Sequence, residues 1–142
     1  MTIPEDIPIN YVDDNVDGLK DLEGKLWCEH GDISKLSSPA LYILYSLSNI
    51  WRKKFNKRLH INSGYRCPEC NKAIGGALNS AHIRGIAFDV HYDNDSELFV
   101  ILKHMLSNGI SVTRMGIGKT YVHFDIGSDK DGYKQEITWL YV

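Results

Sequence analysis

Two short segments that contain histidine and aspartate constrain this chain more than any other feature. Ser80-Ala-His-Ile-Arg-Gly-Ile-Ala-Phe-Asp89 and the later Tyr121-Val-His-Phe-Asp125 offer three strong metal ligands, His82, Asp89 and His123. Imidazole and carboxylate groups suit a divalent cation, zinc above all. Three protein ligands leave a fourth position open for water, which indicates a catalytic rather than a structural site. The pattern therefore predicts a hydrolase that activates water on a metal.

The spacing of these ligands is compatible with a turn followed by strands. His82 and Asp89 are seven residues apart, and Gly85 between them permits the turn that brings them together. On a strand, Asp125 shares a face with His123, so it can either reach the metal or orient a ligand from behind. Tyr121 lies on the same face, where it can border the site or simply pack beside it.

The bulk properties limit the class of protein. A chain of 142 residues, 43% hydrophobic and 24% charged, can build one globular domain. Its net charge of −2 argues against nucleic acid as a partner. No run approaches the roughly 18 apolar residues of a membrane span, which argues against a membrane partner. The acidic N-terminus lacks the apolar region of a secretory signal, so we expect synthesis in a cytoplasm. We also expect a monomer.

Two amphipathic helices are predicted from hydrophobic spacing. The first starts near Ser37 or Ser38, carries Pro39 in its first turn and ends near Asn56. Its apolar stripe consists of Leu41, Leu44, Tyr45, Leu47, Ile50 and Trp51. The second starts at Ser96 as its cap and ends at Asn108-Gly109. Its apolar face consists of Leu98, Ile101, Leu102 and Met105. A short helical stretch is expected near residues 71–74.

Strands are predicted between and after the helices. They cover residues 59–61, 87–90 and 137–141, together with a hairpin of residues 110–115 and 120–126 around Gly116-Ile-Gly118. Residues 1–25 are polar and acidic, and we expect a loosely packed leader there. The sum is an α+β domain in which helices pack on a small antiparallel sheet.

Three ordered motifs resemble a known family of peptidases. They are Ser63-Gly-Tyr-Arg-Cys-Pro-Glu-Cys-Asn71, Asn79-Ser-Ala-His-Ile-Arg-Gly-Ile-Ala-Phe-Asp89 and Val122-His-Phe-Asp125. Together they resemble the zinc D-alanyl-D-alanine carboxypeptidases of peptidase family M15, which also includes phage L-alanyl-D-glutamate endolysins. The resemblance covers roughly residues 26–126 and is closest to the short single-domain branch. It implies one domain over residues 1–142 with the hedgehog/D-Ala-D-Ala peptidase-like fold.

The resemblance also implies roles for individual residues. It implies zinc on His82, Asp89 and His123. It implies a substrate role for Arg66, whose guanidinium can hold a peptide carboxylate or a developing oxyanion. Ser80 matches the serine ahead of the first ligand histidine, which is expected to hydrogen-bond substrate or ligand.

The same resemblance implies an activity. It implies cleavage of stem peptides or cross-bridges in bacterial peptidoglycan, of D,D-carboxypeptidase or L-alanyl-D-glutamate endopeptidase type. Together with the missing signal and the small size, it suggests a phage or prophage protein that meets the cell wall when released or virion-borne.

One position departs from the family pattern. Several relatives carry Glu or Asp three residues before the last ligand histidine, where it serves as general base, and this chain has Thr120 there. Hydrolysis still needs a proton acceptor and a donor for the leaving amine. Asp125 is the first candidate for that catalytic role, and His91 and Asp93 are further candidates. The departure keeps a second function open, namely a non-catalytic module that binds zinc or peptidoglycan.

The cysteines allow a second metal site. Cys67-Pro-Glu-Cys70 forms a C-x-x-C pair, and Cys28-Glu-His30 adds a thiol and an imidazole. Cys₃His is a legitimate structural zinc set, although the Cys28–His30 spacing is tighter than in most zinc knuckles. The sequence favours reduced, buried cysteines over this second zinc, with redox chemistry as a third alternative. A small zinc-ribbon interaction domain built on these four residues is the remaining alternative function.

Overall fold

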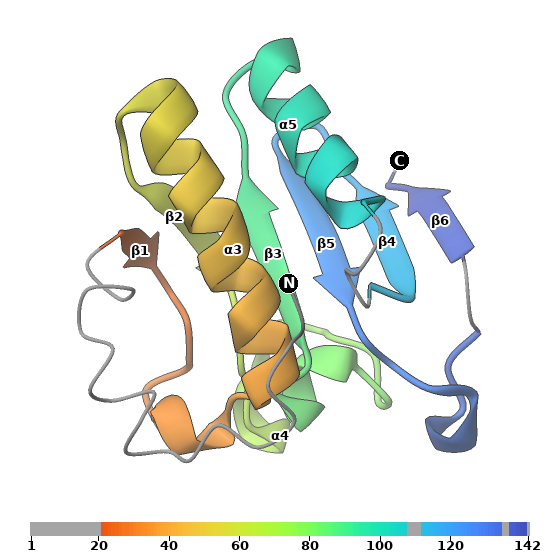
Figure 1. The fold of residues 1–142 in the computed structure, drawn as a ribbon. Helices are drawn as coiled ribbons and strands as arrows, with labels where there is room; N and C mark the ends of the chain where they lie inside the picture. The colour runs from red at the N-terminus through yellow and green to blue at the C-terminus, as the bar shows by residue number, and fades with distance from the viewer. Residues whose placement is uncertain (1–20, 108–111, 135–136, 142) are drawn as a thin grey trace.

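A mixed six-stranded sheet dominates the computed structural model, which describes residues 21–107, 112–134 and 137–141 (Figure 1). The strands are β1 (Leu22–Gly24), β2 (Leu59–Ser63), β3 (Ala87–His91), β4 (Arg114–Ile117), β5 (Tyr121–Asp125) and β6 (Ile137–Leu140). Their order across the sheet is β1-β2-β3-β5-β4-β6. The predicted α+β class is confirmed.

The sheet is not purely antiparallel, and this corrects the prediction from sequence. The central strands β2, β3, β5 and β4 pair antiparallel, whereas β1 runs parallel to β2 and β6 runs parallel to β4. The edge strands come from the two ends of the described chain. They reach the sheet through long connections rather than tight hairpins, and such connections permit parallel pairing.

The predicted first helix is confirmed as α3 (Ser38–Phe55). Ser37 is its N-cap residue, a proline lies in its first turn, and it ends at Asn56 in the left-handed conformation with φ 50°. Leu41, Leu44, Leu47 and Trp51 of the predicted stripe are buried in the core. The cations Arg52, Lys53 and Lys54 occupy the last turn, where a helix favours positive charge.

The second helix, α5 (Asp95–Met105), begins with a different cap from the one predicted. The side chain of Asn94, not Ser96, accepts a hydrogen bond from the Glu97 N–H at 3.0 Å. The helix ends at Met105, and the predicted stop at Asn108-Gly109 lies outside the described residues. A short helix, α4 (Pro68–Ala73), covers most of the predicted helical stretch.

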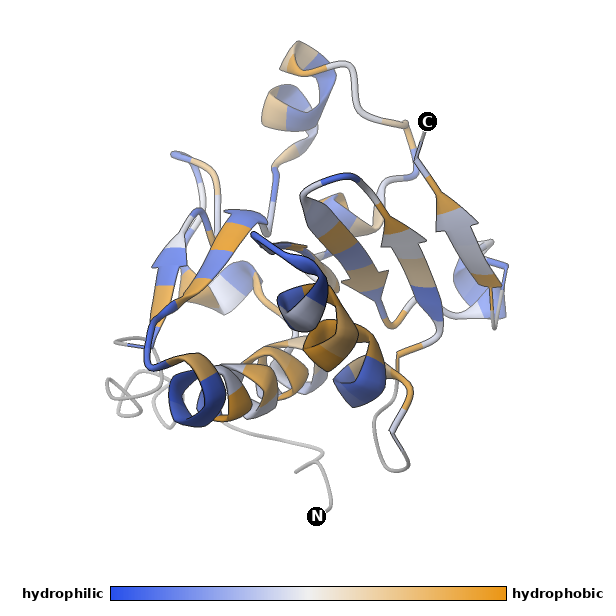
Figure 2. Cartoon of the chain, turned by 90° about the horizontal axis from the view of Figure 1, so that it is seen from above, coloured by the Kyte–Doolittle hydropathy of each residue, from blue (hydrophilic) through white to orange (hydrophobic). Residues whose placement is uncertain are grey.

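Alternation along the central strands separates the core from the polar face of the sheet. Phe88 and Val90 of β3, with Val122 and Phe124 of β5, are fully buried with residues of α3 and α5. Figure 2 shows both helices on this one face. The intervening residues Asp89, His123 and Asp125 therefore point to the opposite face. That face is free of α3 and α5 and is available for a site.

Two further predictions differ from the structure. Gly116 lies in β4 opposite His123, so the hairpin turn is formed by Gly118, Lys119 and Thr120 rather than by Gly116-Ile-Gly118. Within the expected leader, residues 1–20 lie outside the described residues, but Leu22–Gly24 forms β1 and Leu22 is buried. Among the described helices, none has the length and apolar character needed to cross a membrane.

Candidate metal centre

The pairing of β3 with β5 places two of the predicted ligands side by side. Asp89 lies directly opposite His123 in this antiparallel ladder. His82 comes from the 3-10 turn Ala81–Arg84, which ends at Gly85 with φ 70°. A Cβ atom on Gly85 would lie 1.9 Å from the Lys35 carbonyl oxygen, so only glycine fits. This glycine lets the chain turn from His82 into β3.

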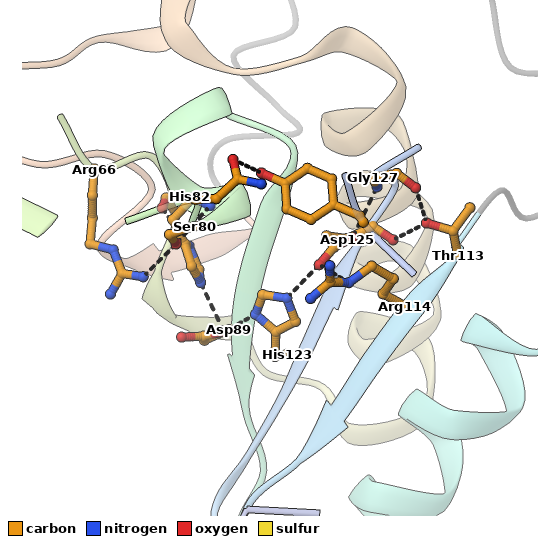
Figure 3. A network of polar contacts seen from close by, with 12 residues as sticks. Arg66, Ser80, His82, Asp89, Thr113, Arg114, His123, Asp125 and Gly127 are labelled. Carbon is orange, nitrogen blue, oxygen red and sulfur yellow. Dashed lines mark hydrogen bonds and ion pairs between the residues drawn. The ribbon is translucent and has the colours of Figure 1, made fainter. Parts of the chain in front are cut away.

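The structure brings His82, Asp89 and His123 together, and we call them the His–Asp–His triad. Asp89 Oδ1 lies 3.2 Å from His82 Nε2 and 2.9 Å from His123 Nδ1 (Figure 3). One ligand atom of each residue lies within 4.8 Å of the other two. Both histidines are buried, and Asp89 is partly exposed. Such convergence is what a metal site with three protein ligands requires.

The far nitrogen of each triad histidine is also engaged. His82 Nδ1 lies 2.7 Å from the Gly64 carbonyl oxygen, and His123 Nε2 lies 2.8 Å from Asp125 Oδ2. Both partners are acceptors, so the proton of each neutral imidazole sits on this far nitrogen. In that neutral, metal-binding state each near nitrogen presents a lone pair, whereas without a metal a proton on it makes the hydrogen bond to Asp89. The two near nitrogens and the Asp89 carboxylate are three electron-pair donors that converge on one point. The residues present therefore suit a divalent metal ion.

Without a metal, hydrogen bonds between the members of the triad control their pKa values. Burial by itself would raise the pKa of Asp89, but hydrogen bonds with His123 and His82 outweigh it and hold that pKa well below its usual value. Burial would lower the pKa of His123, yet hydrogen bonds to Asp125 and Asp89 raise it. Asp89 is therefore ionised at neutral pH, which is the state that a metal ligand needs.

Asp125 lies behind His123 rather than beside Asp89. Its side chain is fully buried, and Figure 3 shows it on the opposite side of the His123 ring from Asp89. Asp125 Oδ1 accepts a hydrogen bond from Gly127 N–H at 2.9 Å, and Arg114 Nε lies 3.4 Å from Oδ2. Of the two roles expected for Asp125, this geometry favours orienting the ligand.

Arg66 and Ser80 lie together next to His82. Arg66 Nη2 donates to Ser80 Oγ at 3.3 Å, and the same oxygen accepts from the His82 backbone N–H at 3.2 Å. The Arg66 backbone N–H donates to the His82 carbonyl oxygen at 3.2 Å. Burial lowers the pKa of Arg66, while the nearby Asp89 charge opposes this shift. Ser80 therefore anchors the segment that carries His82 and holds the Arg66 guanidinium.

An aromatic wall borders His123, and of its members the sequence predicted only Tyr121 beside the site. The rings of His123 and Trp139 lie 5.5 Å apart, and the Arg114 guanidinium lies 5.2 Å from the Trp139 ring. Gly116 makes this possible, because a Cβ atom there would lie 2.6 Å from Trp139. The alternation of Ile137, Trp139 and Tyr141 was a signal for a strand, but it did not reveal which strand β6 would join.

Two tyrosines extend this wall. The rings of Tyr121 and Tyr141 lie 5.2 Å apart. Burial raises the pKa of both phenols, and the Asp89 charge raises both further. Both side chains therefore remain neutral hydrogen-bond donors at neutral pH.

The remaining base candidates, His91 and Asp93, follow Asp89 at the C-terminal end of β3. His91 Nε2 lies 2.7 Å from Asp93 Oδ1, and Lys57 Nζ donates to Asp93 Oδ2 at 3.1 Å. Asp93 is thus engaged by two partners. Thr120 lies in the exposed turn before β5, and its carbonyl oxygen accepts from Tyr92 N–H at 2.9 Å.

A comparison with models of protein families identifies the family of the chain. The model of the Peptidase M15 family matches residues 25–125. The chain belongs to the peptidase M15 family. The matched region runs from just after β1 to the end of β5 and includes the whole His–Asp–His triad. The M15 family is a family of zinc-dependent metallopeptidases, so the predicted recognition is confirmed. A search of curated protein sequences found no match to this chain.

Proposed function

We propose that this M15 protein is a zinc peptidase that cleaves stem peptides or cross-bridges of bacterial peptidoglycan. The observation that carries the proposal is the convergence of His82 Nε2, Asp89 Oδ1 and His123 Nδ1, with both far imidazole nitrogens already engaged. The triad supplies three ligands and leaves room in a tetrahedral sphere for water. Zinc bound there would lower the pKa of a coordinated water toward about 7.

The chain's own residues would orient and hold the reactants. Asp125 and the Gly64 carbonyl fix the two imidazole rings, so the ligands need no rearrangement when the metal binds. Arg66, steadied by Ser80, provides a cation for a substrate carboxylate or for the oxyanion that forms during attack. The partial burial of Arg66 strengthens such a contact, because water screens it less.

The acid–base steps need groups near the triad. Tyr121 and Tyr141 are neutral phenols and can donate a hydrogen bond to an oxyanion or to the leaving amine. His91 lies on the same face of β3 as Asp89, and Asp93 orients its ring. We propose His91 as the first candidate for the proton acceptor, because Asp125 is buried behind a ligand.

Purified peptidoglycan is the substrate that tests the proposal. Wild-type protein loaded with zinc should release peptides whose masses identify the bond that is cut. His82→Ala should release none, because it lacks one triad ligand. His104→Leu is the control, since His104 lies on α5, which packs on the face of the sheet opposite to the triad. Cleavage by His82→Ala at the wild-type rate would contradict the proposal.

A second candidate function rests on Thr120 and Asp125. The family's acidic position is held by a threonine in this chain, and the nearest carboxylate by motif is committed to His123, Gly127 and Arg114. Both observations favour a module that binds zinc and peptidoglycan without cutting it. Zinc binding and sedimentation with peptidoglycan, without any released peptide, would support that function over the peptidase.

A further inference from the structure

Four metal-binding side chains converge at a second place in the molecule. One ligand atom of each lies within 4.8 Å of the other three, and we call them the Cys₃His cluster: Cys28, His30, Cys67 and Cys70. His30 Nδ1 lies 3.5 Å from Cys67 Sγ and 3.4 Å from Cys70 Sγ. All three cysteines are free thiols. Neither the peptidase chemistry nor the triad uses any of these residues.

We propose that the Cys₃His cluster holds a second, structural zinc ion. In tetrahedral zinc sites the Zn–S distance is about 2.3 Å and the Zn–N distance about 2.0–2.1 Å, which separates sulfur from nitrogen by about 3.5 Å. The two measured sulfur–nitrogen distances match this separation. Four protein ligands would close the coordination sphere, which is the mark of a structural site rather than a catalytic one.

Backbone amides around the cluster support bound thiolates. The Cys67 N–H donates to Cys28 Sγ at 3.4 Å, and the Cys70 N–H donates to Cys67 Sγ at 3.3 Å. Hydrogen-bond donors aimed at sulfur stabilise the thiolate, which is the form that binds a metal.

The backbone brings the two halves of the cluster together without help from the metal. Cys28 N–H donates to the Tyr65 carbonyl oxygen at 2.9 Å, and Tyr65 N–H donates to the Leu26 carbonyl oxygen at 2.9 Å. A Cβ atom on Gly64 would lie 2.0 Å from the Leu26 carbonyl oxygen, so the two segments approach closely only because residue 64 is glycine. The site is therefore largely formed before any ion binds.

The position of the cluster suggests what the second zinc does. The cluster joins residues 26–30 to the segment of residues 64–70, and this segment carries two groups that lie beside the His–Asp–His triad. Gly64 fixes the His82 ring, and Arg66 directly precedes Cys67. A cavity of about 600 Å³ lies between the two segments and is lined by Trp27, Tyr65 and Arg66 among others. The second zinc would thus stiffen the loop that positions Arg66.

X-ray absorption at the zinc edge tests the proposal on a protein that lacks the first site. His123→Ala removes a triad ligand and leaves the Cys₃His cluster intact. We expect one zinc per chain in this variant, with sulfur neighbours at about 2.3 Å. A zinc-free variant, or zinc with only nitrogen and oxygen neighbours, would overturn the proposal. This measurement does not depend on peptidase activity. A failure of the proposed peptidase function would therefore leave its result unchanged.

Because His123 is buried and its removal can disturb folding, wild-type protein provides the second measurement. Wild type should contain two zinc ions per chain, and Cys70→Ser should keep one and still bind it through the triad. The three thiols of wild type should react with a thiol reagent only after a chelator has removed zinc. Equal reactivity with and without chelator, or a disulfide detected by mass under non-reducing conditions, would overturn the proposal.

Discussion

His123 Nε2 and Asp125 Oδ2 lie 2.8 Å apart, on the side of the imidazole ring that faces away from Asp89. The two residues alternate along β5 on one face, with Phe124 between them in the core. The carboxylate therefore fixes the proton on Nε2 and leaves Nδ1 free to bind a metal. This relationship separates a positioning role for Asp125 from a role as general base.

Replacement of Asp125 distinguishes these two roles. We expect Asp125→Ala to lower zinc affinity by about 10- to 100-fold, because the His123 ring loses its partner. Competition with a chelator measures the affinity, and peptide release at saturating zinc measures the remaining turnover. Excess zinc should restore most of the activity. A variant that binds zinc normally but stays inactive at every zinc concentration would instead make Asp125 the base.

Gly116 and Trp139 should be energetically coupled. Gly116→Ala puts a methyl group against the Trp139 ring, and such overpacking typically costs about 1–3 kcal/mol of unfolding free energy. Trp139→Ala removes one of the two side chains that this methyl group would meet, the other being Tyr141, so the double variant should lose less than the sum of the two single variants. Denaturant unfolding of all four proteins measures the coupling. Additive losses would contradict the predicted clash.

The start of α5 offers a comparison of two cap residues. Asn94→Ala should lower the unfolding free energy by about 1 kcal/mol, since its side chain accepts the Glu97 N–H. Ser96→Ala is the matched control, because Ser96 lies one residue inside the helix and is exposed. Its effect on unfolding in denaturant should be within about 0.5 kcal/mol. A larger loss of unfolding free energy in Ser96→Ala than in Asn94→Ala would instead identify Ser96 as the cap.

Stability should decrease in mild acid because of His104. Burial lowers the pKa of His104 in the folded state, and a hydrogen bond with the Ile43 backbone only partly opposes this shift. The unfolded chain therefore binds more protons below about pH 6.5, so unfolding free energy falls as pH drops from there toward the folded pKa. The slope from this residue is at most about 1.4 kcal/mol per pH unit.

Denaturant unfolding at about pH 7.5 and about pH 5 measures this effect, because these values lie on either side of the ordinary histidine pKa of about 6.5. His104→Leu should show a smaller loss of stability over the interval, because leucine does not titrate. The difference between wild type and variant isolates His104 from the other histidines. An equal loss in both proteins would contradict the prediction.

Local patterns in the sequence predicted much of the fold. Helical spacing identified α3 and its buried stripe, because that pattern depends only on neighbours along the chain. Pairing of the edge strands could not be predicted, since β1 and β6 join the sheet through contacts with distant residues. The cap of α5 was misassigned because Asn94 and Ser96 are both good cap residues.

The candidate site was predicted less evenly. The three triad residues could be named because histidine and aspartate at these spacings carry the family pattern. Their supports could not, since the Gly64 carbonyl belongs to the backbone and Trp139 reaches His123 only through β6. The sequence favours plain reduced cysteines over the Cys₃His cluster, because the contact between Tyr65 and residues 26–28 that unites the two halves of the cluster leaves no mark in the sequence.

Anomalous diffraction at the zinc edge, from crystals grown with zinc, tests the central claim most directly. The account predicts a peak about 2.0–2.2 Å from each of His82 Nε2, Asp89 Oδ1 and His123 Nδ1. Loss of that peak in His123→Ala crystals would provide the control. A zinc-replete crystal with no anomalous peak at these three atoms would contradict the account.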